Sequence, residues 1–97
     1  MGKVVWSPTA YKDIDLIAEY IARDSVDRAA FFVTKLMKQA DHVLISYPKS
    51  GRIIPEMNDE SWRELIYGAY RIMYRIKENG DVRVSGVIHG ARDWKPE

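Results

Sequence analysis

Residues 70–92 read YRIMYRIKENGDVRVSGVIHGAR, and this stretch contains two runs in which apolar and polar side chains alternate. Alternation with a period of two is typical of β-strands that bury one face. Asn79 and Gly80 lie between the runs, and an Asn-Gly pair in that position predicts a β-hairpin. We therefore expect a hairpin made of residues 70–76 and the run that starts at residue 82.

The length of the turn decides which side chains share a face of the hairpin, because a shift of one residue moves every side chain to the opposite face. A two-residue loop would pair Tyr70 with His89 and mix polar and apolar residues on both faces. A three-residue loop, residues 78–80 with Gly80 in a left-handed bulge, would pair Tyr70 with Ile88. We prefer the second register because it gives one continuous apolar face.

The other face of the preferred hairpin is cationic. It carries Arg71, Arg75, Arg83 and His89, with Arg71 diagonally beside His89 and Arg75 opposite Arg83. Like charges directly opposite destabilise a sheet by roughly 0.2–1 kcal/mol. The cluster therefore indicates an anionic ligand or an acidic partner, and the alternative is a solvated outer face of an ordinary amphipathic sheet.

Composition describes one small globular domain over residues 1–97, since 46% of the residues are hydrophobic and 30% are charged. The chain has no cysteine and two histidines, which excludes disulfides and a thiol nucleophile and is poor material for a zinc site. We expect no metal and no cofactor. No segment approaches the ~20 apolar residues of a membrane helix and no signal peptide is visible, so a soluble cytoplasmic protein is expected.

The distribution of arginines along the chain is more informative about a contact surface than the net charge is. The net charge of +1 argues against a nucleic-acid binder that works by bulk charge. Only two arginines lie in residues 1–48, whereas six lie in residues 49–97. Arginine presents a planar fork that suits phosphate and carboxylate groups, so the second half of the chain is the expected contact surface.

Periodicity and capping residues predict the remaining elements. These are a strand at residues 3–6, a helix at 8–23 after Ser7-Pro8, a helix at 27–46 capped by Ser25 or Asp27, and a strand at 62–67. The order βααβββ predicts an α+β domain in which an antiparallel helix hairpin packs on one face of a mostly antiparallel four-stranded sheet. We expect the segment before residue 62 to be a loop and the arginine face of the sheet to be open.

Several short motifs occur together in a characteristic order. They are Trp6-Ser7-Pro8-x-Ala10, Gly51-Arg52 before Pro55-Glu56, Arg63-Glu64-Leu65, Tyr70-Arg71-Ile72-x-Tyr74-Arg75-Ile76, and His89-Gly90-Ala91-Arg92-Asp93. In this combination the chain resembles the RelE/ParE superfamily of bacterial toxin–antitoxin toxins over nearly its whole length. The resemblance implies a compact toxin that a cognate antitoxin, encoded beside it, neutralises by direct binding in a toxin–antitoxin hetero-oligomer.

The resemblance leaves the activity open, because fold does not fix function. One branch of the superfamily cleaves messenger RNA at the ribosome without a metal, whereas the ParE-like branch inhibits DNA gyrase. Our first hypothesis is ribosome-dependent mRNA cleavage. The alternatives are a gyrase-inhibiting toxin that is not a nuclease, and an inactive relative that serves as a protein-binding module.

The nuclease hypothesis assigns roles to individual residues by resemblance. Arg71 would stabilise charge on the phosphate, Glu56 would act as general base, and His89 would transfer a proton. The residues expected to bind substrate are Arg63, Arg75, Arg83 and Arg92. The chain departs from the nuclease pattern at its end, where WKPE stands in place of a tyrosine, and a catalytic lysine pair before the sheet is not evident.

Overall fold

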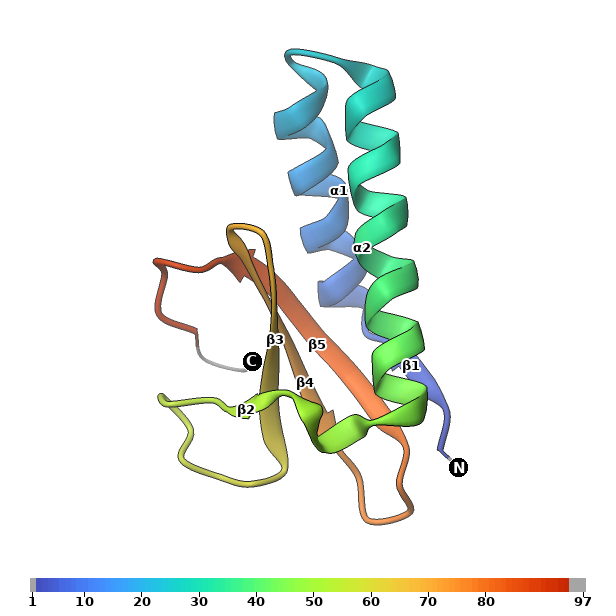
Figure 1. The fold of residues 1–97 in the computed structure, drawn as a ribbon. Helices are drawn as coiled ribbons and strands as arrows, with labels where there is room; N and C mark the ends of the chain where they lie inside the picture. The colour runs from blue at the N-terminus through green and yellow to red at the C-terminus, as the bar shows by residue number, and fades with distance from the viewer. Residues whose placement is uncertain (1, 95–97) are drawn as a thin grey trace.

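The computed structural model describes residues 2–94, which form two layers, a helix hairpin and a sheet (Figure 1). Residues 95–97 of the WKPE segment lie outside the described residues. The elements in chain order are β1 (Val4–Trp6), α1 (Pro8–Ala22), α2 (Val26–Ser46), the 3-10 turn η1 (Pro48–Ser50), β2 (Arg52–Ile53), β3 (Trp62–Tyr67), β4 (Tyr70–Ile76) and β5 (Val82–His89). The α+β class and the helix hairpin are confirmed. Neither α1 nor α2 is long and apolar enough to cross a membrane.

The sheet has five strands in the order β1-β5-β4-β3-β2, one more than predicted. The extra strand is β2, which pairs antiparallel with β3 through Arg52 and Ile53 where we expected a loop. Two residues are too few to show a period in the sequence, so this strand could not be found by alternation. β1 is parallel to β5, while β3, β4 and β5 are joined by antiparallel pairing.

The two helices begin at the residues that the sequence indicates. Ser7 Oγ accepts the N–H of Ala10 at 3.0 Å, and proline occupies the first position of α1. Ser25, rather than Asp27, caps α2, because its Oγ accepts the N–H of Arg28 at 3.1 Å. Each cap satisfies a backbone donor that the first helical turn leaves free. The buried helix residues at the sheet are Ala10, Ile14, Ile17, Leu36, Ala40 and Leu44.

The hairpin between β4 and β5 has the predicted three-residue turn. Gly80 has a φ of +89°, and Lys77 and Asp81 close the loop through an N–H···O bond of 2.8 Å. Next to the turn the preferred register is confirmed, with Tyr74 opposite Val84. At the far end of the hairpin, four residues before Tyr74, the preferred register is wrong, because Tyr70 pairs with His89 instead of Ile88.

A β-bulge in β5 causes this change of register. Tyr74 pairs with Val84 but Met73 pairs with Gly86, so Ser85 is the extra residue. The bulge lies where β1 ends. Beyond this point Ser7 and Asp13, instead of β1, form hydrogen bonds to the edge of β5. Ser7 Oγ donates to the carbonyl of Ser85 at 3.4 Å, and the Asp13 carboxylate accepts the N–H of Val87 at 2.9 Å.

The bulge also gives the sheet apolar residues on both faces. Val87 enters the main core between helices and sheet, whereas Ile88 packs on the outer face. There Ile54, Met73 and Trp94 form a second, smaller buried cluster. The expectation of an open arginine face is therefore wrong over part of its area, because the segment after β2 and the segment after β5 cover it.

Tyr74 links the sheet to the turn that follows α2. Its side chain is fully buried, and its hydroxyl donates to the carbonyl of Pro48 at 2.6 Å and accepts the N–H of Gly51 at 3.0 Å. Burial raises the pKa of this hydroxyl. A Cβ on Gly51 would lie only 2.4 Å from it, so glycine is required for the approach.

Tyr74→Phe should lower the free energy of unfolding by about 1–3 kcal/mol, because a buried N–H and a buried carbonyl lose their partner. Tyr74→Ala should cost about 3–5 kcal/mol, since it also leaves a cavity. Arg75→Ala, at the next position and exposed, should change stability by less than about 0.5 kcal/mol. Urea unfolding measures all three. Equal losses for Tyr74→Phe and Arg75→Ala would contradict the role of the hydroxyl.

Candidate functional site

Arg71 is the second residue of β4, on the outer face of the sheet, and it is 5% exposed. Its Nε donates to Glu64 Oε1 at 2.8 Å, and its two terminal nitrogens donate to the carboxylate oxygens of Glu56 at 2.9 and 3.0 Å. A further bond of 2.8 Å reaches the carbonyl of Arg92. Hydrogen bonds to Glu56 and Glu64 raise the pKa of Arg71, so the buried guanidinium is charged and fully engaged.

Glu56 comes from the segment between β2 and β3. Besides the two bonds from Arg71, its Oε2 accepts the N–H of Trp94 at 3.0 Å. These bonds, above all those from Arg71, lower the pKa of Glu56 to about 2. A carboxylate with so low a pKa is a weak proton acceptor near neutrality, where an effective general base needs a pKa close to the operating pH.

Glu64 completes the cluster and was missed as a site residue. Its carboxylate is 1% exposed and bridges Arg71 and Arg52, whose own side chain is exposed. The four side chains form an alternating chain of charges, Arg52–Glu64–Arg71–Glu56, that is neutral overall. The sequence contained one signal for Glu64, since it is an acidic residue inside the predicted strand 62–67. A carboxylate that is buried in a strand is almost always paired with a cation.

His89 is separated from this cluster by the sheet. It pairs with Tyr70 on the helix side, with ring centroids 5.9 Å apart, and its Nδ1 accepts the N–H of Ala91 at 3.3 Å. Our prediction that His89 lies beside Arg71 is wrong, because the bulge at Ser85 reverses the facing of every later residue of β5.

Arg63 also lies on a different face from Arg71. Its Nε donates to the carbonyl of Glu60 at 2.9 Å, and a terminal nitrogen donates to the carbonyl of Gly51 at 3.0 Å. These bonds fix the two loops that flank β2 and β3. The side chain is thus tied to the protein's own backbone.

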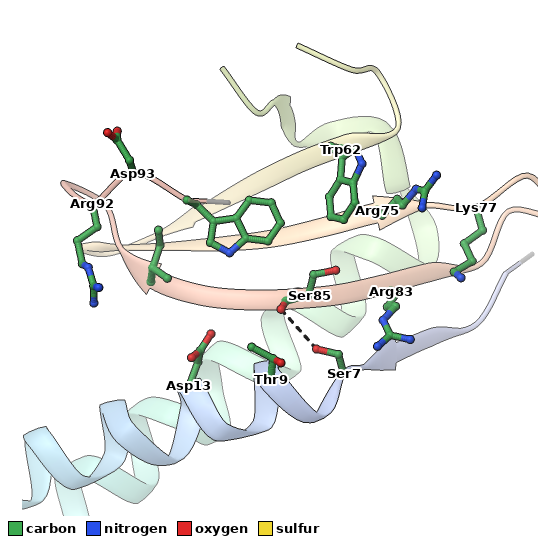
Figure 2. A pocket seen from close by; sticks show the side chains of 12 residues that line it. Ser7, Thr9, Asp13, Trp62, Arg75, Lys77, Arg83, Ser85, Arg92 and Asp93 are labelled. Carbon is green, nitrogen blue, oxygen red and sulfur yellow. Dashed lines mark hydrogen bonds between the residues drawn. The ribbon is translucent and has the colours of Figure 1, made fainter. Parts of the chain in front are cut away.

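The remaining predicted arginines line a groove beside the cluster (Figure 2). The groove has a volume of about 640 Å³, and Arg75, Arg83 and Arg92 all contribute to its wall. Trp62 and Trp94 also line the groove, with ring centroids 5.4 Å apart, and the Arg75 guanidinium lies 5.4 Å from the centre of the Trp62 ring. The structure thus brings three of the predicted substrate-binding residues together.

The geometry supports anion binding more directly than proton transfer. The predicted base is paired with the predicted phosphate ligand, and the predicted histidine is on the opposite face. Within residues 2–94 no group of three or more His, Cys, Asp and Glu side chains is placed to hold a metal ion. What the outer face offers to a partner is a cationic groove bordered by aromatic rings.

Arg71→Ala should lower the free energy of unfolding by about 3–5 kcal/mol, because it leaves the buried Glu64 with one partner and Glu56 with none on the sheet. An arginine on an open face would tolerate this change, but the Arg71 guanidinium is buried. Chemical denaturation of the variant against Arg75→Ala tests it. A midpoint equal to that of the Arg75 variant would show that the ion cluster does not stabilise the domain.

Stability should fall as the pH drops from about 4.5 towards 2, because the folded pKa of Glu56 is depressed from 4.5 to about 2. The stabilisation is complete above the unfolded value and is lost on protonation. Glu56→Gln should reduce stability above pH 4.5 and show a smaller decline below it. Urea titrations of both proteins at several pH values measure this difference, and parallel curves would contradict it.

Comparison with known proteins identifies the family of the chain. The family model described as ParE toxin of type II toxin-antitoxin system, parDE, matches residues 4–94. Y4kP of Sinorhizobium fredii, a protein named as a toxin, is 34% identical over 94 residues, which are 95% of this chain and 92% of that protein.

Two solved structures share the fold. The chromosomal ParDE system of P. aeruginosa has a TM-score of 0.75 at 18% identity, over 92% of this chain and 96% of that chain. The toxin–antitoxin complex RelBE2 of Mycobacterium tuberculosis has a TM-score of 0.65 at 20% identity, over 91% of this chain and 96% of that chain. From the family match and the relative in Sinorhizobium fredii, the chain belongs to the ParE family of type II toxin–antitoxin toxins.

Proposed function

We propose that this toxin inhibits growth by binding DNA gyrase and that it does not cut messenger RNA. The observation that carries the proposal is the two-bond ion pair between Arg71 and Glu56. It occupies both residues that a nuclease would need free, one to stabilise the phosphate and one to accept a proton. The ParE family match favours the same branch of the superfamily.

The position of His89 supports the proposal. A general acid has to reach the atom it protonates within about 2.6–3.2 Å, directly or through one water. His89 lies across the sheet from Arg71, next to Tyr70. A single substrate phosphate at Arg71 would therefore not meet this imidazole, so acid and base are not combined at one place.

A cognate antitoxin is the second part of the proposal. The solved relatives are named as a ParDE toxin–antitoxin system and as a RelBE2 toxin–antitoxin complex. By analogy, a small protein encoded beside this chain binds it in a hetero-oligomer and neutralises it. The cationic groove of this domain is a surface that such a partner would cover.

Purified toxin should inhibit DNA supercoiling by gyrase, while total RNA from cells that express it stays intact by primer extension. Glu56→Gln and His89→Ala should keep toxicity near the wild-type level, because neither residue transfers a proton. Circular dichroism confirms that each variant is folded. Cut messages in cells expressing wild-type toxin, lost in both variants, would replace this proposal with the ribosome-dependent nuclease.

Co-expression of the adjacent reading frame should restore growth. The two purified chains should also elute together in size-exclusion chromatography. Growth inhibition that persists with both proteins present, together with separate elution, would contradict the toxin–antitoxin pairing for this chain. An unrelated small acidic protein expressed at the same level serves as the control for non-specific charge neutralisation.

A further inference from the structure

The carboxylate of Glu56 accepts hydrogen bonds only from donors that belong to other parts of the chain. Its two oxygens accept bonds of 2.9 and 3.0 Å from the Arg71 guanidinium and one of 3.0 Å from the Trp94 N–H. Two parallel N–H···O bonds are the arrangement in which a guanidinium recognises carboxylate and phosphate groups in general. These donors on Arg71 and Trp94 therefore form a carboxylate site.

Partners other than Glu56 hold the donors of the carboxylate site in position. The Nε of Arg71 donates to Glu64 at 2.8 Å, and one terminal nitrogen also donates to the carbonyl of Arg92 at 2.8 Å. The Trp94 side chain is buried and packs in the smaller apolar cluster of the outer face. The fold itself thus forms the site, and Glu56 is one carboxylate that fits it.

Of the two carboxylates on Arg71, that of Glu56 is the one that solvent reaches. Its side chain is 23% exposed, whereas the Glu64 side chain is 0% exposed. A pocket of about 350 Å³ adjoins Glu56. The pocket is lined by Arg52, Pro55, Glu56, Arg71 and residues 90–93. A ligand from outside the chain can therefore approach Arg71 from the side that Glu56 occupies.

The backbone around Glu56 has hydrogen bonds of its own. The N–H groups of Met57 and Asn58 donate to the carbonyl of Ile54 at 3.1 and 3.0 Å, which closes a turn around Glu56. Ile54 is fully buried, and its N–H donates to the carbonyl of Trp62 at 3.0 Å. Rotation of the Glu56 side chain out of the carboxylate site therefore leaves the hydrogen bonds of this turn in place.

The charge of the site selects the class of ligand. The four-residue ion cluster is neutral with Glu56 in place and carries a charge of +1 without it, because two arginines then face one glutamate. Arg92 and Asp93 also line the pocket, and their charges offset each other. A monovalent carboxylate restores neutrality and offers two oxygens to the guanidinium. A phosphate dianion would leave an excess of negative charge in a partly buried site.

We propose that this site binds a carboxylate from outside the chain and that Glu56 closes it as a built-in competitor. The Glu56 carboxylate is tethered next to the site and so has a high effective concentration there. A free carboxylate therefore enters only weakly while Glu56 is in place. The site does not depend on the cellular target of the toxin, because it consists only of contacts among Arg71, Glu56 and Trp94.

Glu56→Ala opens the site for a defined probe, because it removes a carboxymethyl group that acetate can replace. At neutral pH and constant ionic strength, acetate should raise the unfolding midpoint of this variant in a saturable manner relative to NaCl, since it binds the folded chain. Glu60→Ala is the matched control. Glu60 lies on the same segment, is exposed and takes part in no salt bridge within residues 2–94, so acetate and NaCl should act alike on its variant.

The amide of Trp94 reports binding directly. Its cross peak in amide NMR spectra should shift when acetate is added to Glu56→Ala, and the titration gives a Kd. In the wild-type chain the same shift should require at least about tenfold more acetate, since Glu56 competes from within the chain. An equal Kd in the two proteins would overturn the role of Glu56 as a competitor.

Other outcomes would contradict the carboxylate site itself. Acetate that fails to bind Glu56→Ala, or that acts equally on Glu60→Ala, would overturn it. Phosphate binding to Glu56→Ala without acetate binding would also overturn it, because Arg71 would then serve a different class of anion. If Glu56→Ala is unfolded in NaCl, acetate should restore its native circular dichroism spectrum, and failure to do so would overturn the site. None of these measurements involves gyrase or an antitoxin, so a negative result leaves the proposed function intact.

Discussion

The buried Arg71 guanidinium is the interaction on which the outer half of this domain depends. Removing a charged group from water costs several kcal/mol unless partners offset the loss. Arg71 finds its partners in three places: Glu64 on β3, Glu56 in the segment after β2, and the carbonyl of Arg92 after β5. One side chain therefore fixes two irregular segments onto the sheet. Trp94 then packs on Met73 and Ile54, and the apolar cluster they form lies directly beside the ion cluster.

The same pairing decides where positive charge remains available. Glu64 and Glu56 are both bound to Arg71, and Arg52 shares Glu64, so this cluster has no net charge to offer a ligand. Arg75 and Arg83 belong to a different row of the sheet, and within residues 2–94 neither takes part in a salt bridge. One face of a single sheet is thus divided into a neutral part that holds the structure and a cationic part that is open to a partner. An arginine therefore belongs to the cationic part only if it is exposed, and its presence in the sequence alone does not decide this.

The sequence was sufficient for the elements that local physics specifies. Caps at Ser7 and Ser25, the helix stripes and the left-handed Gly80 all depend on neighbours a few residues away. The bulge at Ser85 depends on Ser7 and Asp13, more than seventy residues earlier in the chain. No local pattern encodes it, and without it His89 is placed on the wrong face. The pairing of Arg71 with Glu56 is likewise a contact between distant segments, which no local pattern in the sequence encodes.

A shared fold does not decide between cleavage and binding, so the difference has to come from the pairing of a few side chains. For Arg71 to act on a phosphate in this chain, its bonds to Glu56 would have to open. Glu56 would then lose two donors, and the segment that carries Trp94 would be held by fewer contacts. Gly86 shows how closely that segment is fitted, because a Cβ there would lie 3.1 Å from Trp94 Nε1. Chemistry at Arg71 would therefore require the bonds that hold Glu56 and Trp94 in place to open, at a cost of several kcal/mol.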